Sequence, residues 1–217
     1  MNNPAYLVEG DLEQKFIQNT CPGCPVKKIN CNGIWTSIEA IAKRVGTLGR
    51  LLHKRHSPLV VVFDREGREE SAEHLEKTFR EVLAQEKIDV PIVVGIPDRN
   101  VEAWILADYE MFLQSARLGA SSPVSTFEGR NGKLVIKQTL GEGKSYVETI
   151  DGVAWLKAAR PAVIQKHSPS FNRLFSALSD LDCWWLKQLQ LPLTANANVF
   201  PTNEPASQSI STAGGVS

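Results

Sequence analysis

Four short apolar runs in the first half of the chain are separated by longer segments in which apolar residues recur every three or four positions. The runs occupy residues 5–10, 26–31, 59–63 and 90–96. Such a run is typical of a buried strand, whereas the longer spacing is typical of an amphipathic helix. Because the two patterns alternate over residues 5–115, we expect an α/β, Rossmann-like domain with a mainly parallel four-stranded sheet flanked by helices.

The pattern also predicts how the helices and the rest of the chain are organised. We expect one helix from about Glu69 to Lys87, and another that carries apolar residues from Val101 to Phe112. Residues 1–118 would form the main domain and residues 119–190 a mostly helical extension packed on it, although 133–140 fits a helix or a strand. Residues 191–217 are rich in Asn, Thr, Ser, Pro and Ala, which predicts a disordered tail.

Carboxylates follow the most apolar run directly, because Asp64 and Glu66 come just after residues 59–63. In parallel α/β sheets, ligands bind outside the carboxyl ends of the strands, so this position favours a functional site. A plainer interpretation is that the two side chains solubilise the strand end and cap the next helix. Glu9 and Glu13 follow the first run in the same way, and Glu102 follows the fourth.

These acidic residues would cluster if the strands before them are neighbours in the sheet. Carboxylates that lie together raise one another's pKa, which makes the cluster costly without a partner. Hard divalent cations remove that cost, and Mg²⁺ prefers such oxygen ligands. The sequence therefore predicts a cation site at the carboxyl edge of the sheet.

Charge and hydropathy along the chain narrow the possible partners. Lys plus Arg and Asp plus Glu both number 24, so any nucleic-acid surface would be a local patch. One candidate is the helix predicted after Ser37, whose basic residues usually form a solvated face but could contact phosphates: Lys43, Arg44, Arg50, Lys54 and Arg55. No apolar run approaches the roughly 20 residues that span a bilayer, and no signal peptide is visible, so we expect a cytoplasmic protein.

Two further patterns resemble known sites only in part. Cys21 and Cys24 have metal-ligand spacing, which is half of a zinc site. Cys31 could be a third ligand and His53, His56 or Cys183 a fourth, but none falls at a recurring spacing, so we expect reduced cysteines and no zinc. Residues 141–145 read Gly-Glu-Gly-Lys-Ser, but a phosphate-binding P-loop would need Gly where this chain has Gln138.

The motifs Val8-Glu9-Gly10 and Phe63-Asp64-Arg65-Glu66 resemble those of the TOPRIM superfamily, the topoisomerase–primase domains. Members carry Glu-Gly after the first strand and Asp-x-Asp after the third, so Glu66 is one methylene longer than the family pattern. Within the superfamily the chain is most similar to the OLD-like nuclease branch, including its small stand-alone proteins. Glu13, four residues after Glu9, and Glu102, after the fourth strand, match further acidic positions of that branch. The resemblance covers about residues 5–115.

The resemblance implies a TOPRIM-like fold and a hydrolase that cleaves nucleic-acid phosphodiesters with one or two Mg²⁺ or Mn²⁺ ions. Glu9, Asp64 and Glu66 would be the core metal ligands, with Glu9 also counted as catalytic. Glu13 and Glu102 would complete a second ion or orient its water. Lys166 is the candidate for the basic residue with which this branch neutralises the transition state.

The resemblance also implies an ATPase partner and a role in antiviral, anti-phage defence. It leaves open whether the nucleic acid is DNA, RNA or tRNA. One alternative is a non-catalytic module that keeps the fold and only binds the ATPase, although the retained carboxylates favour catalysis. Another is the synthesis or transfer of phosphodiesters, as in primases and topoisomerases. The chain looks too small to hold the separate tyrosine-bearing domain that topoisomerases need.

Overall fold

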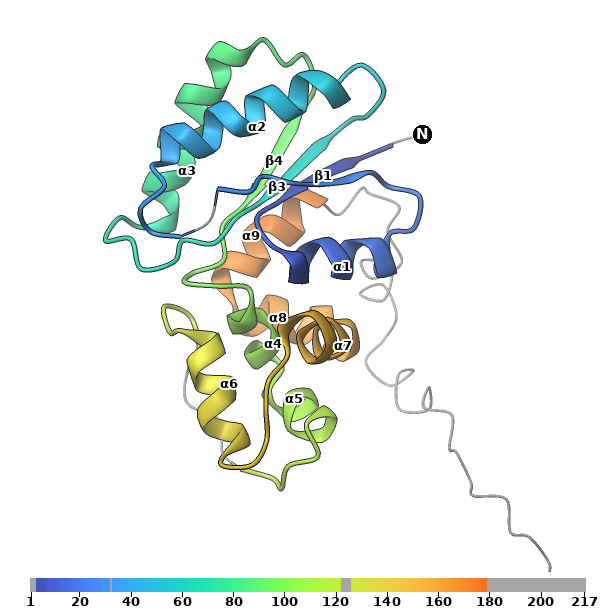
Figure 1. The fold of residues 1–217 in the computed structure, drawn as a ribbon, viewed down its shortest axis with the longest axis vertical. Coiled ribbons are helices and arrows are strands. Elements are labelled where there is room, and N and C mark those ends of the chain that lie inside the picture. Colours follow the sequence, from blue (N-terminus) through green and yellow to red (C-terminus); the bar gives the residue numbers. More distant parts are fainter. Residues whose placement is uncertain (1–2, 32, 122–125, 179–217) are drawn as a thin grey trace, which may run out of the picture.

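The computed structural model of the protein describes residues 3–31, 33–121 and 126–178. Within them, four strands form one all-parallel sheet in the order β2-β1-β3-β4. The strands are β1 (Ala5–Val8), β2 (Val26–Lys28), β3 (Leu59–Val62) and β4 (Ile92–Gly95). Helices flank the sheet, so the predicted Rossmann-like α/β fold is confirmed (Figure 1).

Both faces of the sheet are buried, which explains why its central strands are apolar throughout. Successive side chains of a strand point to opposite faces. Alternate residues of β1 and β3 therefore enter two different apolar clusters. One face packs against α1 (Asp11–Thr20) and α9 (Pro169–Leu178) through Tyr6, Val8, Val60 and Val62. The other packs against α2 (Ile38–Leu52) and α3 (Ala72–Leu83) through Leu7, Val61 and Phe63 (Figure 1).

Serine side chains fix where the two helices of the second face begin. The hydroxyl of Ser37 accepts a hydrogen bond from the Ala40 N–H at the start of α2. The hydroxyl of Ser71 does the same for the His74 N–H at the start of α3. A serine cap satisfies a backbone donor that the first helical turn leaves free. Helix α3 therefore begins at Ala72, later than the predicted start near Glu69, and is followed by the short 3₁₀ helix η1 (Ala84–Glu86).

The remaining helices pack beneath the carboxyl edge of the sheet (Figure 1). They are α4 (Glu102–Ala107), α5 (Tyr109–Ser115), α6 (Gly132–Leu140), α7 (Val153–Ala158) and α8 (Pro161–His167), with a π-helical turn η2 (Glu148–Gly152) before α7. The ambiguous segment 133–140 is thus helical. The residues predicted as a disordered tail lie outside the described residues.

The predicted continuous helix from Val101 to Phe112 is wrong, because the chain breaks at Asp108 between α4 and α5. Asp108 is fully buried and caps α5 by accepting a hydrogen bond from the Met111 N–H. Its carboxylate also binds the Arg160 guanidinium through two contacts of 2.9 and 2.6 Å. Such bidentate pairs fix geometry as well as charge, so this one ties α5 to the start of α8.

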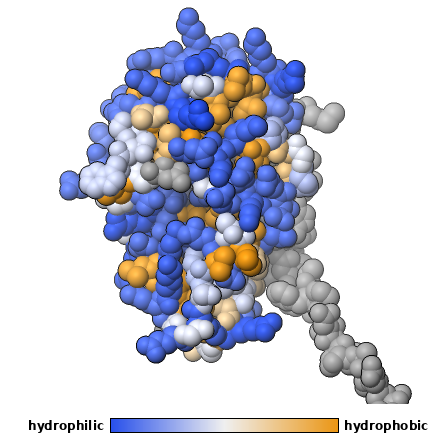
Figure 2. Space-filling model, in the orientation of Figure 1, coloured by the Kyte–Doolittle hydropathy of each residue, from blue (hydrophilic) through white to orange (hydrophobic). Residues whose placement is uncertain are grey.

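In the described part of the chain, no helix combines the length and the apolar character that crossing a membrane requires. On the face shown in Figure 2, hydrophilic side chains predominate and apolar residues appear as small separate patches. Scattered apolar side chains are normal on a protein surface.

Candidate metal centre

A cavity of about 110 Å³ opens at the carboxyl ends of β1 and β3. All five predicted acidic residues line it, together with a lysine and two further carboxylates: Glu9, Glu13, Asp64, Glu66, Glu102, Lys133, Asp11 and Glu148. The prediction that these carboxylates gather at one edge is therefore confirmed. Their coming together follows from the strand order, because β1 lies between β2 and β3 and pairs Val8 with Val62.

The Glu9 carboxylate lies directly against the end of the neighbouring strand. The Asp64 N–H donates a hydrogen bond of 2.6 Å to Glu9 Oε2. Glu13 reaches back from the first turn of α1, and a Cβ on Gly10 would lie only 2.9 Å from Glu13 Oε2. A glycine after Glu9 therefore leaves the space that the second carboxylate occupies.

Glu66 stands in a backbone conformation that residues other than glycine seldom adopt, with a φ of 57°. Two backbone hydrogen bonds hold it there, since the Glu66 N–H donates to Arg99 O at 2.7 Å and the Arg65 N–H donates to Pro97 O at 3.1 Å. Strained conformations of this kind persist where the surroundings enforce them, often at functional sites. The turn after β3 is thus fixed against the turn after β4.

The electrostatics of the cavity show how unfavourable these carboxylates are without a cation. Burial raises the pKa of Glu13 to about 7, and the charges of Glu9 and Glu102 add to the effect. Burial, then the four neighbouring carboxylates, hold the pKa of Asp64 well above its usual range. Although Asp64 is partly exposed as a residue, its Oδ1 is buried and has no hydrogen-bond partner among the described residues.

The second half of the chain supplies the positive charge of the cavity through Lys133, on the first turn of α6. Lys133 forms an ion pair with Glu148. Burial lowers the pKa of Lys133, but its bond to Glu148 and the charges of Glu102 and Asp64 outweigh that effect and raise it. Burial raises the pKa of Glu102, and the charge of Lys133 partly offsets that rise. The Tyr146 hydroxyl donates a hydrogen bond of 3.2 Å to Glu102 Oε1.

Lys133 reaches the cavity because α6 begins directly against the start of α4. The Gly132 N–H donates to Asn100 Oδ1 at 3.0 Å, and Asn100 Nδ2 donates to Asn131 Oδ1 at 3.2 Å. A Cβ on Gly132 would lie 2.6 Å from the Ala103 backbone nitrogen, so only a glycine permits this approach. Sequence reasoning missed Lys133, although Asn131-Gly132 just before it is a typical helix start.

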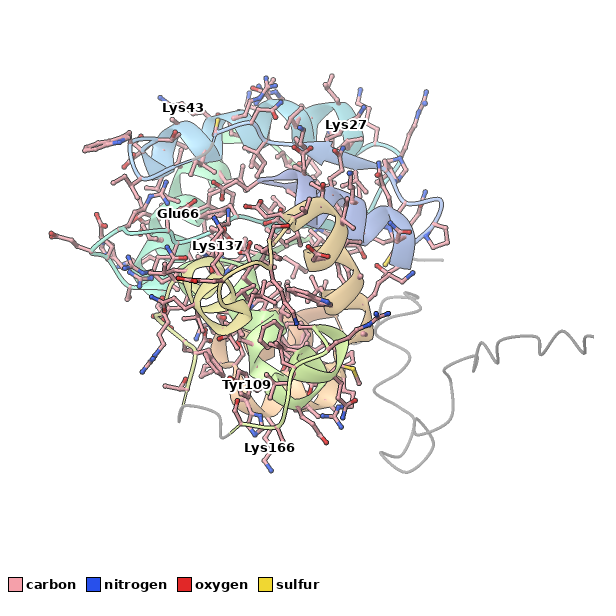
Figure 3. All side chains as sticks on the ribbon, turned by 60° about the horizontal axis from the view of Figure 1, so that its bottom comes forward. Lys27, Lys43, Glu66, Tyr109, Lys137 and Lys166 are labelled. Atoms are coloured by element: carbon pink, nitrogen blue, oxygen red, sulfur yellow. The ribbon has the colours of Figure 1, made fainter. Side chains whose placement is uncertain are left out.

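The structure does not bring Lys166, the predicted basic residue, to this cavity. Lys166 is exposed on the last turn of α8 and does not line the cavity. Figure 3 shows it pointing into solvent, well away from Glu66.

The donor set of the cavity fits a hard divalent cation. All the converging acceptors are carboxylate oxygens, and the unpaired Asp64 Oδ1 lacks the positive partner that burial normally requires. In the described residues, no three of these side chains already stand at metal-ligand positions. Binding would therefore need small side-chain rotations, for which the 110 Å³ cavity leaves room.

Cys21, Cys24 and Cys31 do not line this cavity. Cys24 and Cys31 are free thiols. The expectation that the cysteines are reduced is wrong for Cys21, which is disulfide-bonded and so has no thiolate for a metal. The spacing of Cys21 and Cys24 could not reveal this, because a disulfide depends on which thiols meet in space.

The raised pKa of Glu13 predicts that the metal-free protein loses stability as the pH rises. The folded state keeps Glu13 protonated to about pH 7, whereas the unfolded chain ionises it near the ordinary glutamate pKa of 4.5. The contribution of neutral Glu13 to the free energy of unfolding is therefore complete below about pH 4.5. It is lost as the pH rises through about 7, and the loss is on the order of 3 kcal/mol in all. Glu13→Gln, which stays neutral, should lose less stability over this range.

Thermal melting in a chelator at pH 5 and pH 8 checks this expectation. The wild type should lose more of its melting temperature between the two pH values than Glu13→Gln, and the variant should be the more stable protein at pH 8. Equal losses in both proteins would contradict the raised pKa.

Comparison with known proteins identifies the family of the chain but not its activity. A search of curated proteins and a search of solved structures each found no match. The model of one protein family, described as a domain of unknown function (DUF4276), matches residues 8–179. That match covers most of the chain and includes every residue that lines the acidic cavity. The protein therefore belongs to the DUF4276 family.

Proposed function

We propose that this protein is a nuclease that cleaves nucleic-acid phosphodiesters with Mg²⁺ or Mn²⁺ held in the acidic cavity. The observation that carries the proposal is the buried, unpaired Asp64 Oδ1 among the carboxylates of Glu9, Glu13 and Glu102. A fold gains nothing from holding repelling carboxylates together out of water, whereas a cation site requires it. A module that only bound a partner would have no use for this arrangement.

The residues of the cavity divide into two roles. Glu9, Asp64 and Glu66 would hold the first ion, and Glu13 and Glu102 would complete a second ion or orient its water. When bound, such ions activate water at neutral pH and stabilise the leaving oxygen. Lys133 carries its charge into the same cavity and would offset the charge that develops on the phosphate. Tyr146 fixes one oxygen of Glu102 by its hydrogen bond, which orients that carboxylate.

The TOPRIM resemblance supports the same function, because its motif residues are those that meet in the cavity. It also leads us to propose a TOPRIM-like nuclease of the OLD-like branch that works in the cytoplasm with an ATPase partner in anti-phage defence. These wider proposals rest on the resemblance alone.

A cleavage assay with the purified full-length chain tests the nuclease proposal. Labelled single-stranded DNA, duplex DNA, RNA and tRNA are each incubated with Mn²⁺, with Mg²⁺ and with a chelator. We expect cleavage of at least one substrate with Mn²⁺ or Mg²⁺ and none in the chelator. Cleavage that persists in the chelator would contradict a metal-dependent reaction. No cleavage of any substrate, together with no Mn²⁺-induced rise in melting temperature, would contradict the site itself.

A further inference from the structure

A tryptophan that is almost fully exposed stands on the short turn before α2, which Arg68 links to the strand end that carries Asp64. Trp35 is 94% exposed, whereas the other two tryptophans of the described residues, Trp104 and Trp155, are buried. We propose that Trp35 is a stacking platform for an unpaired base next to the bond that is cut, so that the substrate is single-stranded there. This inference rests on the proposed nuclease function and names its substrate class.

The short turn that carries Trp35 is tied to the strand end that carries Asp64. The guanidinium of Arg68 donates to Gly33 O at 3.0 Å and to Thr36 O at 2.9 Å, on either side of Trp35. Its other terminal nitrogen donates to Asp64 O at 3.2 Å. Arg68 therefore connects the backbone at Asp64 to the backbone on both sides of Trp35. This fixes the backbone from which the exposed ring projects.

A second contact brings the same turn against the segment that follows Glu66. A Cβ on Gly67 would lie 3.4 Å from Ile34 Cγ2 and 3.2 Å from an Arg99 guanidinium nitrogen. Ile34, the neighbour of Trp35, thus lies against the residue that follows Glu66. In the proposed complex, the stacked base belongs to the same strand as the phosphate in the cavity.

Cations close to Trp35 could contact the backbone of such a strand. The Arg99 guanidinium donates to Glu66 O at 3.3 Å, and one of its terminal nitrogens lies beside Gly67. Helix α2 follows Trp35 and carries Lys43 and Arg44, with Glu39 as the one carboxylate on its first two turns. Figure 3 shows Lys43 and Glu66 toward the same side of the molecule.

This combination fits unpaired nucleotides better than a duplex. Proteins that bind single strands pair exposed aromatic rings with nearby cations, because every base has a face on which to stack. In a duplex the bases are already stacked on one another, so an exposed tryptophan would gain little. The net charge of zero also argues against binding that relies on a general basic field.

The test measures oligonucleotide binding by full-length protein that carries Asp64→Asn, so that the strand is not cut. The probes are a fluorescein-labelled single-stranded oligothymidylate and a labelled duplex of the same length, and the readout is fluorescence anisotropy in Mn²⁺. Trp35→Ala should weaken single-strand binding roughly tenfold, as expected for the loss of one stacked base. Trp35→Phe should keep most of the affinity.

Leu51→Ala is the matched control, since Leu51 is a 75% exposed apolar residue at the opposite end of α2. It should change neither affinity, and Trp35→Ala should leave duplex binding unchanged. If the parent and Trp35→Ala bind the single strand equally well, the stacking proposal is overturned while the nuclease proposal stands. Equal binding is the result expected if Trp35 contacts a protein partner and not a base. Equal weakening of both probes also overturns the stacking proposal. If the Asp64→Asn parent binds neither probe and the wild type cleaves no substrate, the proposed function fails, and the inference with it.

Discussion

Asp64→Asn should reduce metal-dependent cleavage by about 10³-fold or more. Asp64 emerges from the central strand β3, beside Glu9 of β1, and its buried Oδ1 lacks a protein partner. An amide of the same size keeps the packing but removes the charge that would bind the cation. Because a metal site depends on its complete ligand set, the loss should appear mainly in turnover and in the Mn²⁺ concentration needed for cleavage.

The same substitution should leave the metal-free fold intact. Four carboxylates repel Asp64, so the neutral variant should melt at the same temperature as the wild type in a chelator, or slightly higher. The Mn²⁺-induced rise in melting temperature should shrink, because a ligand stabilises only the state that binds it. Asp89→Asn is a suitable control, since Asp89 is exposed before β4, away from the cavity. A variant that cleaves normally, or one that Mn²⁺ stabilises as much as the wild type, would show that the site is misplaced.

Lys133→Met should lower the cleavage rate by about 10²- to 10³-fold, the range for removing one group that stabilises charge in a transition state. Methionine keeps much of the apolar stem of lysine, so packing around α6 should survive while the charge is lost. The effect should appear in kcat at saturating Mn²⁺, because Lys133 is not a metal ligand. Melting curves would check that the variant folds.

Lys166→Met is the comparison that separates the two lysines. Lys166 is exposed on α8 and outside the cavity, so its loss should leave cleavage within about twofold of the wild type. The opposite ranking, with Lys166→Met inactive and Lys133→Met active, would show that Lys166 is the basic residue, as the resemblance implies.

The sheet and its acidic edge were predictable because each rests on a local pattern. The apolar runs at 5–8 and 59–62 are strands because both of their faces are covered, and Glu9 and Asp64 follow them directly. The parallel order then brings the two carboxylates together without further information. The place of Glu102 was also predictable from the sequence, since it lies just after the fourth strand.

The features that were missed depend on contacts between residues far apart in the chain. Lys133 reaches the cavity through the approach of Gly132 to Ala103, which no hydrophobic pattern records. The break at Asp108 is similar, because the apolar spacing runs on through it while the buried pair with Arg160 ends the helix. In both cases tertiary contacts override local propensity.

The junction of α4 and α6 gives a rule for recognising relatives of this protein. Asn100 binds both Asn131 and Gly132, and Gly132 has no room for a larger residue. Two short sequence motifs, Asn-x-Glu at 100–102 and Asn-Gly-Lys at 131–133, are therefore linked by one steric and hydrogen-bonding constraint. In an alignment the two motifs should change together, and a chain with only the first motif would lack the equivalent of Lys133. Such a paired signature could sort members of the family by whether they can complete the cavity, before any of them is purified.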